Sequence, residues 1–315
     1  MNAPRADEDV KACVRGGLAA LCRVVVGKDR AVRRAMAVLL SGGHLLLEDL
    51  PGVGKTTLAK GLSRLLGGSY QRVQGTNDLL PSDLLGIHLW EAAEQRFRFQ
   101  EGPLFANVVL LDELNRIGPK TQSALLEVMV EGQVTLDRNT YRLPEPFFVI
   151  ATQNPMDHSG TFPLPESQMD RFAAVLHLGY PDPQAERLIL RGEAGAETLD
   201  SLHQAMDLDG WRLARARVRA VAIADAALAY AERVVAKIRE ARGFCSTRAA
   251  GHWLALARAE AWLDGRAFIT PDDLQATLGD AMAHRGTMDD RRLNRDERRE
   301  QLGRLMEEVP VGWKP

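Results

Sequence analysis

The feature that most constrains this chain is a glycine-rich loop between an apolar run and a helix-length segment. Residues 45–60 read LLLEDLPGVGKTTLAK, so an apolar strand would lead into the loop and a helix would follow it. In this order of elements, backbone N–H groups of the loop and the helix N-terminus can surround a phosphate. We therefore expect a Mg-nucleotide site here, and we disfavour a chance glycine-rich turn. The expected cofactor-binding residues are Gly52, Val53, Gly54, Lys55, Thr56 and Thr57.

Two side chains of this loop have expected roles. Lys55 would contact the β- and γ-phosphate oxygens, and Thr56 would place its hydroxyl on Mg²⁺. The loop departs from the usual pattern GxxxxGK[ST] at one position, because Asp49 stands where the first glycine is expected. A carboxylate beside a polyphosphate is unfavourable, so we expect the Asp49 side chain to turn away while Gly52 and Gly54 preserve the tight turn.

Two other apolar runs end in polar residues that suit phosphate chemistry. VVLLDELNR at 108–116 places Asp112 and Glu113 at the end of a strand, and FFVIATQNP at 147–155 places Asn154 at the end of another. In a parallel sheet these ends face the ligand crevice. Asp112 would hold Mg²⁺ through its water shell, Glu113 would polarise the attacking water, and Asn154 would orient that water. Each run alone is typical of an ordinary strand terminus; together with the phosphate loop they predict a hydrolytic site.

The apolar pattern predicts an α/β core. Short apolar runs alternate with helix-length segments, which is typical of a mostly parallel sheet with helices on both faces. Two stretches have alternating residues around a polar turn and predict β-hairpins that either project from the core or extend the sheet edge. The expected strands are 44–48, 108–112 and 147–152, the helices 55–66 and 119–131, and the hairpins 86–99 and 133–143.

The rest of the chain is expected to be helical. Residues 8–23 carry apolar residues at helical spacing, and YPDPQAE at 180–186 marks a boundary before a segment rich in Ala, Leu and Arg. A Thr-Pro-Asp-Asp sequence at 270–273 predicts a helix start. We expect an N-terminal helix at 1–23, a nucleotide-binding core at 24–180, a helical lid at 181–288 and a charged helix or tail at 289–315.

Composition limits the class of protein. With 315 residues, 45% of them hydrophobic, the chain is expected to fold into two globular domains without a metal or a disulfide. Its three cysteines lack CxxC spacing, its histidines lack ligand spacing, and no signal-peptide or membrane pattern is evident, so we expect a cytoplasmic protein without membrane insertion. The net charge of −2 gives no general reason to expect nucleic acid. Residues 211–258 nevertheless contain ten Lys or Arg against three Asp or Glu, which indicates a solvated helix face or, less favourably, a nucleic-acid surface.

The motifs together resemble the MoxR family of AAA+ ATPases. The resemblance covers about residues 24–285 and rests on GVGKTT, LLDELNR and ATQNP together with four connecting phrases. It implies a P-loop αβα core with a parallel sheet and β-hairpin inserts, followed by an all-α lid, with ATP bound between the two in a homo-oligomeric ring, usually a hexamer. The connecting phrases are DLLPSD at 78–83, PKTQSALLEVM at 119–129, TFPLPESQMDRF at 161–172 and LGYPDP at 178–183.

The resemblance also implies roles for individual residues. Asn154 falls at the sensor 1 position, and Arg171 matches the arginine finger that acts on a neighbouring subunit, with Arg116 as the competing candidate. Arg248, in CSTRAA, falls at the sensor 2 position, where the family more often has Ser-Pro-Arg; a solvated arginine at a helix start is the alternative. Val24 to Gly27, including Val26, matches the segment that packs on adenine, although an apolar turn would have the same pattern.

Finally, the resemblance implies a chaperone-like ATPase that remodels or activates a client protein. A partner with a von Willebrand factor A domain would be a separate polypeptide, because this sequence has no DxSxS run. Two other functions are kept open: a scaffold that assembles on ATP with little turnover, and a DNA-dependent ATPase, whose only support is the basic segment.

Overall fold

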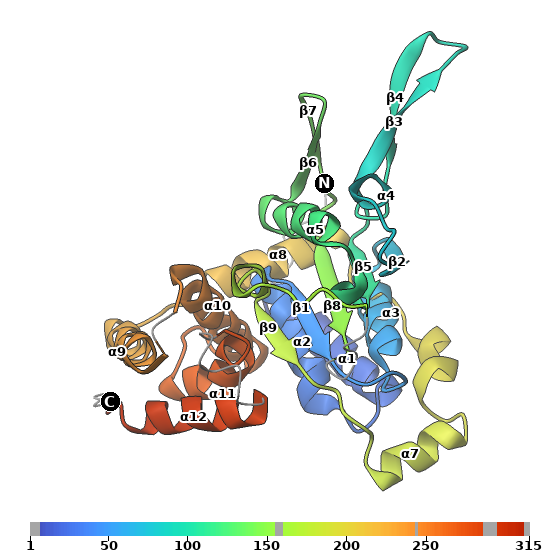
Figure 1. Cartoon of the computed structure of the whole chain (residues 1–315). Coiled ribbons are helices and arrows are strands. Elements are labelled where there is room, and N and C mark those ends of the chain that lie inside the picture. Colours follow the sequence, from blue (N-terminus) through green and yellow to red (C-terminus); the bar gives the residue numbers. More distant parts are fainter. Residues whose placement is uncertain (1–6, 155–159, 243–244, 286–294, 312–315) are drawn as a thin grey trace.

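The computed structural model describes residues 7–154, 160–242, 245–285 and 295–311 (Figure 1). At its centre lies a five-stranded sheet with the order β2-β5-β8-β1-β9, in which all neighbouring strands are parallel. The predicted α/β core with a parallel sheet is confirmed. The strands are β1 (Leu45–Glu48), β2 (Tyr70–Gln74), β5 (Val108–Asp112), β8 (Phe148–Gln153) and β9 (Ala174–Leu176).

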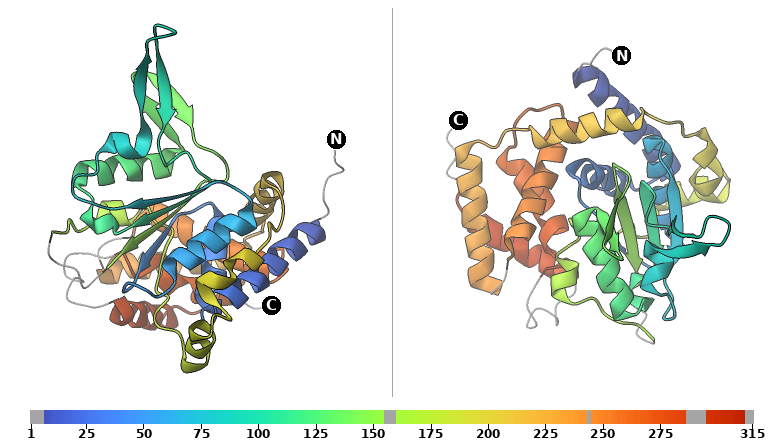
Figure 2. Two further views of the ribbon diagram at one scale, coloured as in Figure 1. Left: turned by 90° about the vertical axis from the view of Figure 1, so that its right-hand side faces the viewer. Right: turned by 90° about the horizontal axis from the view of Figure 1, so that it is seen from above.

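The three central strands divide their side chains between two hydrophobic clusters. Leu45, Leu47 and Val108 contact one cluster, whereas Leu46 and Val109 contact the other. Successive strand residues point to opposite faces, so an uninterrupted apolar run is what a strand covered on both sides requires. Figure 2 shows helices on both faces of the sheet. The first face is covered by α1 (Asp7–Val24), α2 (Asp29–Ser41) and α3 (Lys55–Leu66), the second by α4 (Pro81–Leu85), η1 (Leu114–Arg116) and α5 (Pro119–Glu131).

Both predicted hairpins are present, and each forms its own two-stranded sheet. They project from the core beyond α4 and α5 (Figure 1), which excludes the alternative that they extend the edge of the central sheet. In the second hairpin Asp137 and Arg138 both have positive φ angles, 47° and 72°, as a two-residue type I′ turn requires. The strands are β3 (Gly86–Glu91) and β4 (Arg96–Glu101), then β6 (Gln133–Leu136) and β7 (Asn139–Arg142).

The chain beyond residue 180 is helical, as the sequence predicts. Asp182, Asp207 and Ser246 cap helices by accepting backbone N–H groups, and Thr270 forms a capping box with Asp273 at the predicted helix start. No helix in the described part of the chain is long and apolar enough to cross a membrane. The elements that follow β9 are α7 (Pro183–Leu190), η2 (Gly195–Ser201), α8 (Leu208–Arg219), α9 (Asp225–Arg242), α10 (Thr247–Leu263), α11 (Pro271–Met282) and α12 (Arg295–Glu307).

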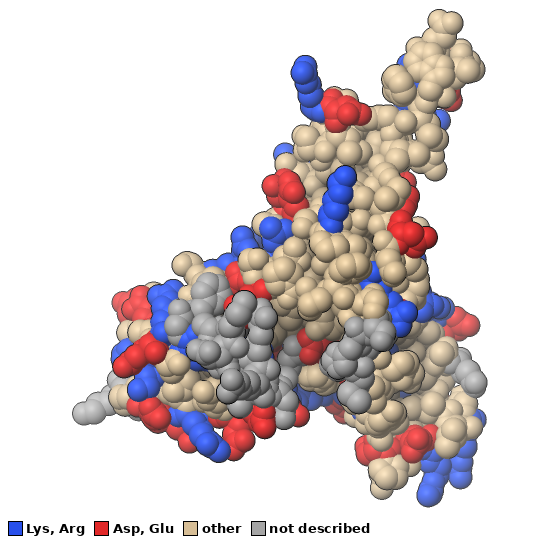
Figure 3. Space-filling view, in the orientation of Figure 1, with Lys and Arg blue, Asp and Glu red and all other residues tan. Residues whose placement is uncertain are grey.

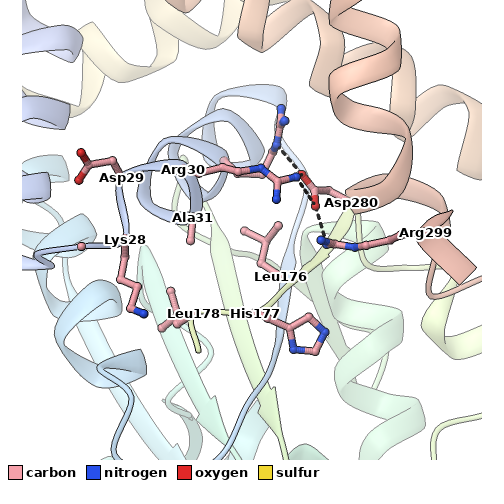
Figure 4. Close-up of a pocket in the computed structure, with 11 residues that line it drawn as sticks. Lys28, Asp29, Arg30, Ala31, Leu176, His177, Leu178, Asp280 and Arg299 are labelled. Carbon is pink, nitrogen blue, oxygen red and sulfur yellow. Dashed lines mark hydrogen bonds and ion pairs between the residues drawn. The ribbon is translucent and has the colours of Figure 1, made fainter. Parts of the chain in front are cut away.

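Buried ion pairs join the helical part to the core. Arg34 of α2 contacts Glu260 of α10 at 2.7 Å and Asp280 of α11 at 2.8 Å. Arg30 and Arg299 also contact Asp280, whose side chain is only 1% exposed (Figure 4). Because unpaired charges are costly in an apolar interior, this network fixes α10, α11 and α12 against α2. Part of the tail predicted at 289–315 is thus a helix, α12, which packs against α11. Residues 1–6, 286–294 and 312–315 lie outside the described part of the chain.

The arginine-rich segment 211–258 does not form a uniformly basic face. Arg212, Arg217 and Lys237 pair with acidic residues outside the segment, namely Asp209, Asp7 and Glu308. Arg215 and Arg242 are largely buried, and burial lowers the pKa of Arg215 to about 10. On the face shown in Figure 3, positive and negative side chains are mixed over the helical part.

Candidate nucleotide site

The predicted phosphate loop lies between β1 and α3. Gly52 and Gly54 have φ angles of 82° and 99°, in the left-handed region that favours glycine. A Cβ atom added at either position would meet nothing within 4 Å, so the backbone conformation, and not crowding, explains these glycines. Lys55 is the first residue of α3, which points the helix N-terminus at the loop.

Lys55 is held inside the loop in this structure. Its Nζ atom donates to the carbonyl oxygens of Asp49 at 2.8 Å and Leu50 at 3.0 Å. Burial lowers the pKa of Lys55, a shift that the negative charges of Asp49, Asp112 and Glu113 oppose. A phosphate group next to Lys55 would compensate for this lost hydration and favour the charged ammonium.

Asp49 turns away from the loop, as expected from its place beside a phosphate site. Its Oδ2 atom accepts the backbone N–H of Leu178 at 2.6 Å, and its Oδ1 atom accepts that of Gly179 at 3.0 Å. The carboxylate is therefore directed towards the segment after β9. The replacement of the usual glycine leaves the phosphate side of the loop free of the Asp49 carboxylate.

One threonine contacts both acidic residues at the end of β5, through the carboxylate of Asp112 and the backbone of Glu113. The Thr152 hydroxyl donates to Asp112 Oδ1 at 3.3 Å and accepts the backbone N–H of Glu113 at 3.0 Å. Glu113 has a φ angle of 58°, which is uncommon for a residue other than glycine and aims its side chain away from the line of the strand. Thr152, on β8, therefore fixes both acidic residues from the neighbouring strand.

Strand β2 supplies two further contacts to these carboxylates. Arg72 Nε donates to Asp112 Oδ2 at 2.7 Å, and Gln74 Nε2 donates to Glu113 Oε2 at 2.9 Å. Arg116 also contacts Glu113 Oε2, at 3.1 Å. None of Arg72, Gln74 and Thr152 was predicted as a site residue. Thr152 lies within the ATQNP motif but had no assigned role, whereas Arg72 and Gln74 lie outside the motifs, with the polar residues just before Gly75 as the available signal.

These groups line one cavity of about 340 Å³. Most of the predicted phosphate and metal residues contribute to its wall, from the loop, the end of β5 and the end of β8. Thr56 and Asp112 offer a hydroxyl and a carboxylate oxygen there, and oxygen ligands beside substrate phosphates are what Mg²⁺ prefers. The lining residues are Pro51, Gly52, Gly54, Lys55, Thr56, Thr57, Arg72, Gln74, Asp112, Glu113, Thr152 and Asn154.

A second cavity of about 400 Å³ adjoins the first. The two cavities share Gly52, Gly54 and Thr57, so a ligand can extend from one into the other. The wall of the second is more apolar and comes from the α1–α2 turn, the loop and the segment from Tyr180 to Ala196. Its lining residues are Val24, Val25, Val26, Lys28, Gly52, Val53, Gly54, Thr57, Tyr180, Pro181, Glu186, Ile189, Leu190, Gly195 and Ala196.

Gly27 has a different position from the one expected. It lines not this second cavity but a smaller one, of about 180 Å³, that also includes Lys28. Its φ angle is 73°, and a Cβ atom added to it would lie 2.8 Å from Ala185. Glycine at this position lets the α1–α2 turn approach α7 closely. The sequence predicts a lid at 181–288. The first part of this range, which contains α7, lines the second cavity, whereas helices α8–α12 line neither the first nor the second cavity.

Neither Arg171 nor Arg248 lines the first or the second cavity, and Arg248 lies next to the residue that precedes Arg171. Arg248 Nη1 lies 3.7 Å from Asp170 Oδ2, and Asp170 directly precedes Arg171 in the chain. Two guanidinium nitrogens of Arg171, Nε and Nη1, are buried without a hydrogen-bond partner among the described residues. Asp170 also binds Arg285 at 2.9 Å and the Ser246 hydroxyl at 2.8 Å, so it joins the core to the start of α10.

Comparisons with known proteins agree with this geometry. Residues 44–174 match the ATPase family associated with various cellular activities (AAA), and residues 236–305 match the AAA lid domain. The chaperone MoxR1 of Mycobacterium tuberculosis is 37% identical, over 84% of this chain and 72% of that protein. The MoxR protein of Methylorubrum extorquens is 32% identical over 84% of each chain, and YeaC of Bacillus subtilis is 40% identical over 84% of this chain and 83% of that protein.

A solved structure has the same fold across nearly the whole chain. The crystal structure of a candidate ATPase from Cytophaga hutchinsonii superimposes with a TM-score of 0.87, at 31% identity, over 96% of each chain. The family match, the extent of the similar relatives and the shared fold agree with the motifs quoted above. The chain belongs to the MoxR family of AAA+ ATPases.

Proposed function

We propose that this protein hydrolyses Mg-ATP at the cavity between the phosphate loop and the ends of β5 and β8. The observation that carries the proposal is that Lys55, Thr56, Asp112, Glu113 and Asn154 line this one cavity. These residues come from three separate parts of the sequence, and their types match the needs of phosphoryl transfer to water.

The chain's own groups have distinct tasks in this mechanism. Lys55 exchanges its contacts with the Asp49 and Leu50 carbonyl oxygens for phosphate oxygens. Asn154 orients the attacking water and Glu113 accepts its proton, while Thr56 and Asp112 hold the metal. Mg²⁺, when bound, supplies positive charge that neutralises the charge developing on the phosphate oxygens.

Substitution of Glu113 tests hydrolysis separately from binding. Glu113→Gln should lower the rate of phosphate release by at least about a hundredfold, because general-base catalysis contributes about 10²–10⁴, while ATP affinity stays near that of the wild type. Glu127→Gln, an exposed change on α5, is the matched control. Unchanged turnover in Glu113→Gln would exclude Glu113 as the base and would contradict the proposal.

We further propose that the protein acts as a homo-oligomeric ring, with a hexamer as the expected number. Arg171 and Arg248 support this proposal, because neither lines the first or the second cavity of its own chain and Arg248 contacts Asp170, the residue before Arg171. In a ring, both can serve the nucleotide of the neighbouring subunit, with Arg171 as the finger. Arg116 is less suited to that role, because it contacts Glu113 of its own chain.

Mixing two inactive variants tests the arrangement between subunits. Glu113→Gln and Arg171→Ala should each be inactive, and mixed rings should regain activity where an intact Glu113 faces an intact Arg171. The ring size should be measured in parallel with ATP present. Absence of recovery, in rings shown to exchange subunits, would exclude Arg171 as a finger acting between subunits.

The ring is proposed to couple hydrolysis to chaperone-like remodelling of a client protein in the cytoplasm. The MoxR1 relative, which is named a chaperone, supports this reading. A separate protein with a von Willebrand factor A domain is the proposed partner. Capture of partners on the Glu113→Gln variant with ATP, compared with Lys55→Ala, tests this; retention of client activation by Glu113→Gln would contradict remodelling driven by hydrolysis.

A further inference from the structure

Asp49 lies where the phosphate loop and the segment after β9 meet. Its backbone oxygen accepts the Lys55 ammonium at 2.8 Å, and its backbone N–H donates to Gln153 O of β8 at 3.2 Å. Its carboxylate binds the N–H groups of Leu178 and Gly179. One residue, only 7% exposed, thus contacts the phosphate-binding lysine, the central sheet and the chain that leads to α7.

The segment held by this carboxylate forms one wall of the second cavity. Its residues that line that cavity are Tyr180, Pro181, Glu186, Ile189 and Leu190. The segment also contacts the core elsewhere, in part through the buried Leu178 side chain. Those contacts include the hydrogen bond from Lys28 Nζ to Tyr180 O and the close approach of Gly27 to α7.

Lys28 and Leu178 also line the smaller cavity, of about 180 Å³ (Figure 4). Leu178 thus lines the smaller cavity, and Tyr180, two residues later, lines the second cavity. Leu178 is buried in the first hydrophobic cluster, whereas Tyr180 is 71% exposed, so backbone hydrogen bonds contribute to fixing the segment from Gly179 onwards. Hydrogen bonds from backbone N–H groups to a carboxylate are among the stronger ones in proteins.

We propose that Asp49 is a positioning residue that holds α7 beside the phosphate loop and so determines affinity for the base end of the nucleotide. The inference rests on the proposed binding of ATP across both cavities. It gives a reason for an aspartate at the place of the loop's first glycine: the carboxylate faces the α7 segment and not the phosphate. Asp49 is assigned no contact with the reacting atoms.

Two ligands separate this role from an effect on the phosphate loop. Mg-ATP would fill both cavities, whereas inorganic tripolyphosphate with Mg²⁺ would fill only the first. In Asp49→Gly, which restores the glycine of the usual loop pattern, we expect affinity for ATP to fall by about tenfold and affinity for tripolyphosphate to stay within about twofold, as measured by calorimetry. In steady-state hydrolysis, KM should rise more than kcat falls.

Asp49→Asn provides a second variant that keeps the size of the side chain but weakens its acceptors. The same preferential loss of ATP affinity is expected in it, and Asp209→Asn, an exposed change on α8, serves as the control. Thermal unfolding would show that each variant is folded.

The outcomes are distinguishable. An equal loss of affinity for ATP and tripolyphosphate would mean that Asp49 shapes the phosphate loop. Unchanged affinity for both ligands would mean that the Asp49 carboxylate is dispensable. Either result overturns the inference. If the wild type binds neither ligand, the proposed function itself fails. If the wild type binds ATP but a folded Asp49→Gly variant shows no selective loss of ATP affinity, this inference is refuted and the proposed function is not.

Discussion

At the scale of single residues, the candidate site depends on hydroxyl and amide groups to which the short motifs assign no role. Lys55, Thr56, Asp112, Glu113 and Asn154 could be predicted because each follows an apolar run in a familiar order. Their orientation could not, because it comes from residues on neighbouring strands. Thr152 reads as part of an ordinary strand, and only the parallel pairing of β5 with β8 places its hydroxyl between the two acidic residues.

Thr152→Val tests this positioning role. Valine has nearly the same shape but leaves the Glu113 N–H without its acceptor and removes one contact of Asp112. A buried group left unpaired costs about 1–3 kcal/mol, so kcat should fall by about tenfold or more. Thr152→Ser, which keeps the hydroxyl, should restore most of the rate. A Thr152→Val enzyme with wild-type kcat would show that Thr152 does not orient the carboxylates.

At the scale of elements, the buried strands could be predicted and the edge strands could not. β1, β5 and β8 are buried on both faces and therefore have uninterrupted apolar sequences. β2, with the sequence YQRVQ, is partly exposed at the sheet edge, and β9 has only three residues. Such segments carry little periodicity of their own. Their place in the sheet is determined by pairing with β5 and β1.

The buried His44 side chain joins β8 to α5, and we expect it to make the stability of the fold depend on pH. His44 Nδ1 accepts the backbone N–H of Val149 at 3.0 Å, so Nε2 carries the hydrogen that binds Met129 O at 2.8 Å. Protonation would remove that acceptor. Burial, the main cause, lowers the pKa of His44 to about 4, with a smaller contribution from Arg215.

The direction of this effect follows from proton uptake. Between the ordinary histidine pKa of about 6.5 and the lowered value, the unfolded chain binds a proton that the folded chain does not, so stability falls as the pH falls. From about pH 7 to about pH 5, His44 should account for about 2 kcal/mol of lost stability in urea unfolding. His44→Gln should remove that share of the decrease, whereas His203→Gln, at an exposed position, should not. An unchanged decrease in His44→Gln would contradict the assignment.

At the scale of the whole molecule, the position of the helical part was the least predictable feature. Helix starts such as 270–273 are local signals, but the docking of α10 and α11 on α2 depends on pairs such as Arg34 with Asp280, far apart in the sequence. This docking sets Arg248 beside Asp170 and leaves α7 as the part of the predicted lid that reaches the cavities. The near-zero net charge likewise conceals pairs between distant segments.

Asp280 is expected to be important for the stability of the joined core and helical part. It is the shared partner of Arg30, Arg34 and Arg299, so Asp280→Ala removes one acidic partner from all three arginines and leaves the buried Arg34 with Glu260. Breaking a buried pair from one side costs about 3–5 kcal/mol, which urea unfolding would measure. Glu300→Gln, which breaks an exposed pair with Arg304, should cost less than about 1 kcal/mol. Similar small losses in both variants would show that the Asp280 network does not hold the two parts together.

The loop at 49–57 is proposed to bind the phosphates of ATP through Lys55. Calorimetric measurement of Mg-ATP affinity in Lys55→Ala tests this claim most directly. Loss of the ammonium from the cavity should abolish detectable binding or weaken it by at least about a hundredfold. Lys60→Ala, an exposed change on the same helix, should bind ATP like the wild type. A folded Lys55→Ala protein with unchanged ATP affinity would contradict the claim.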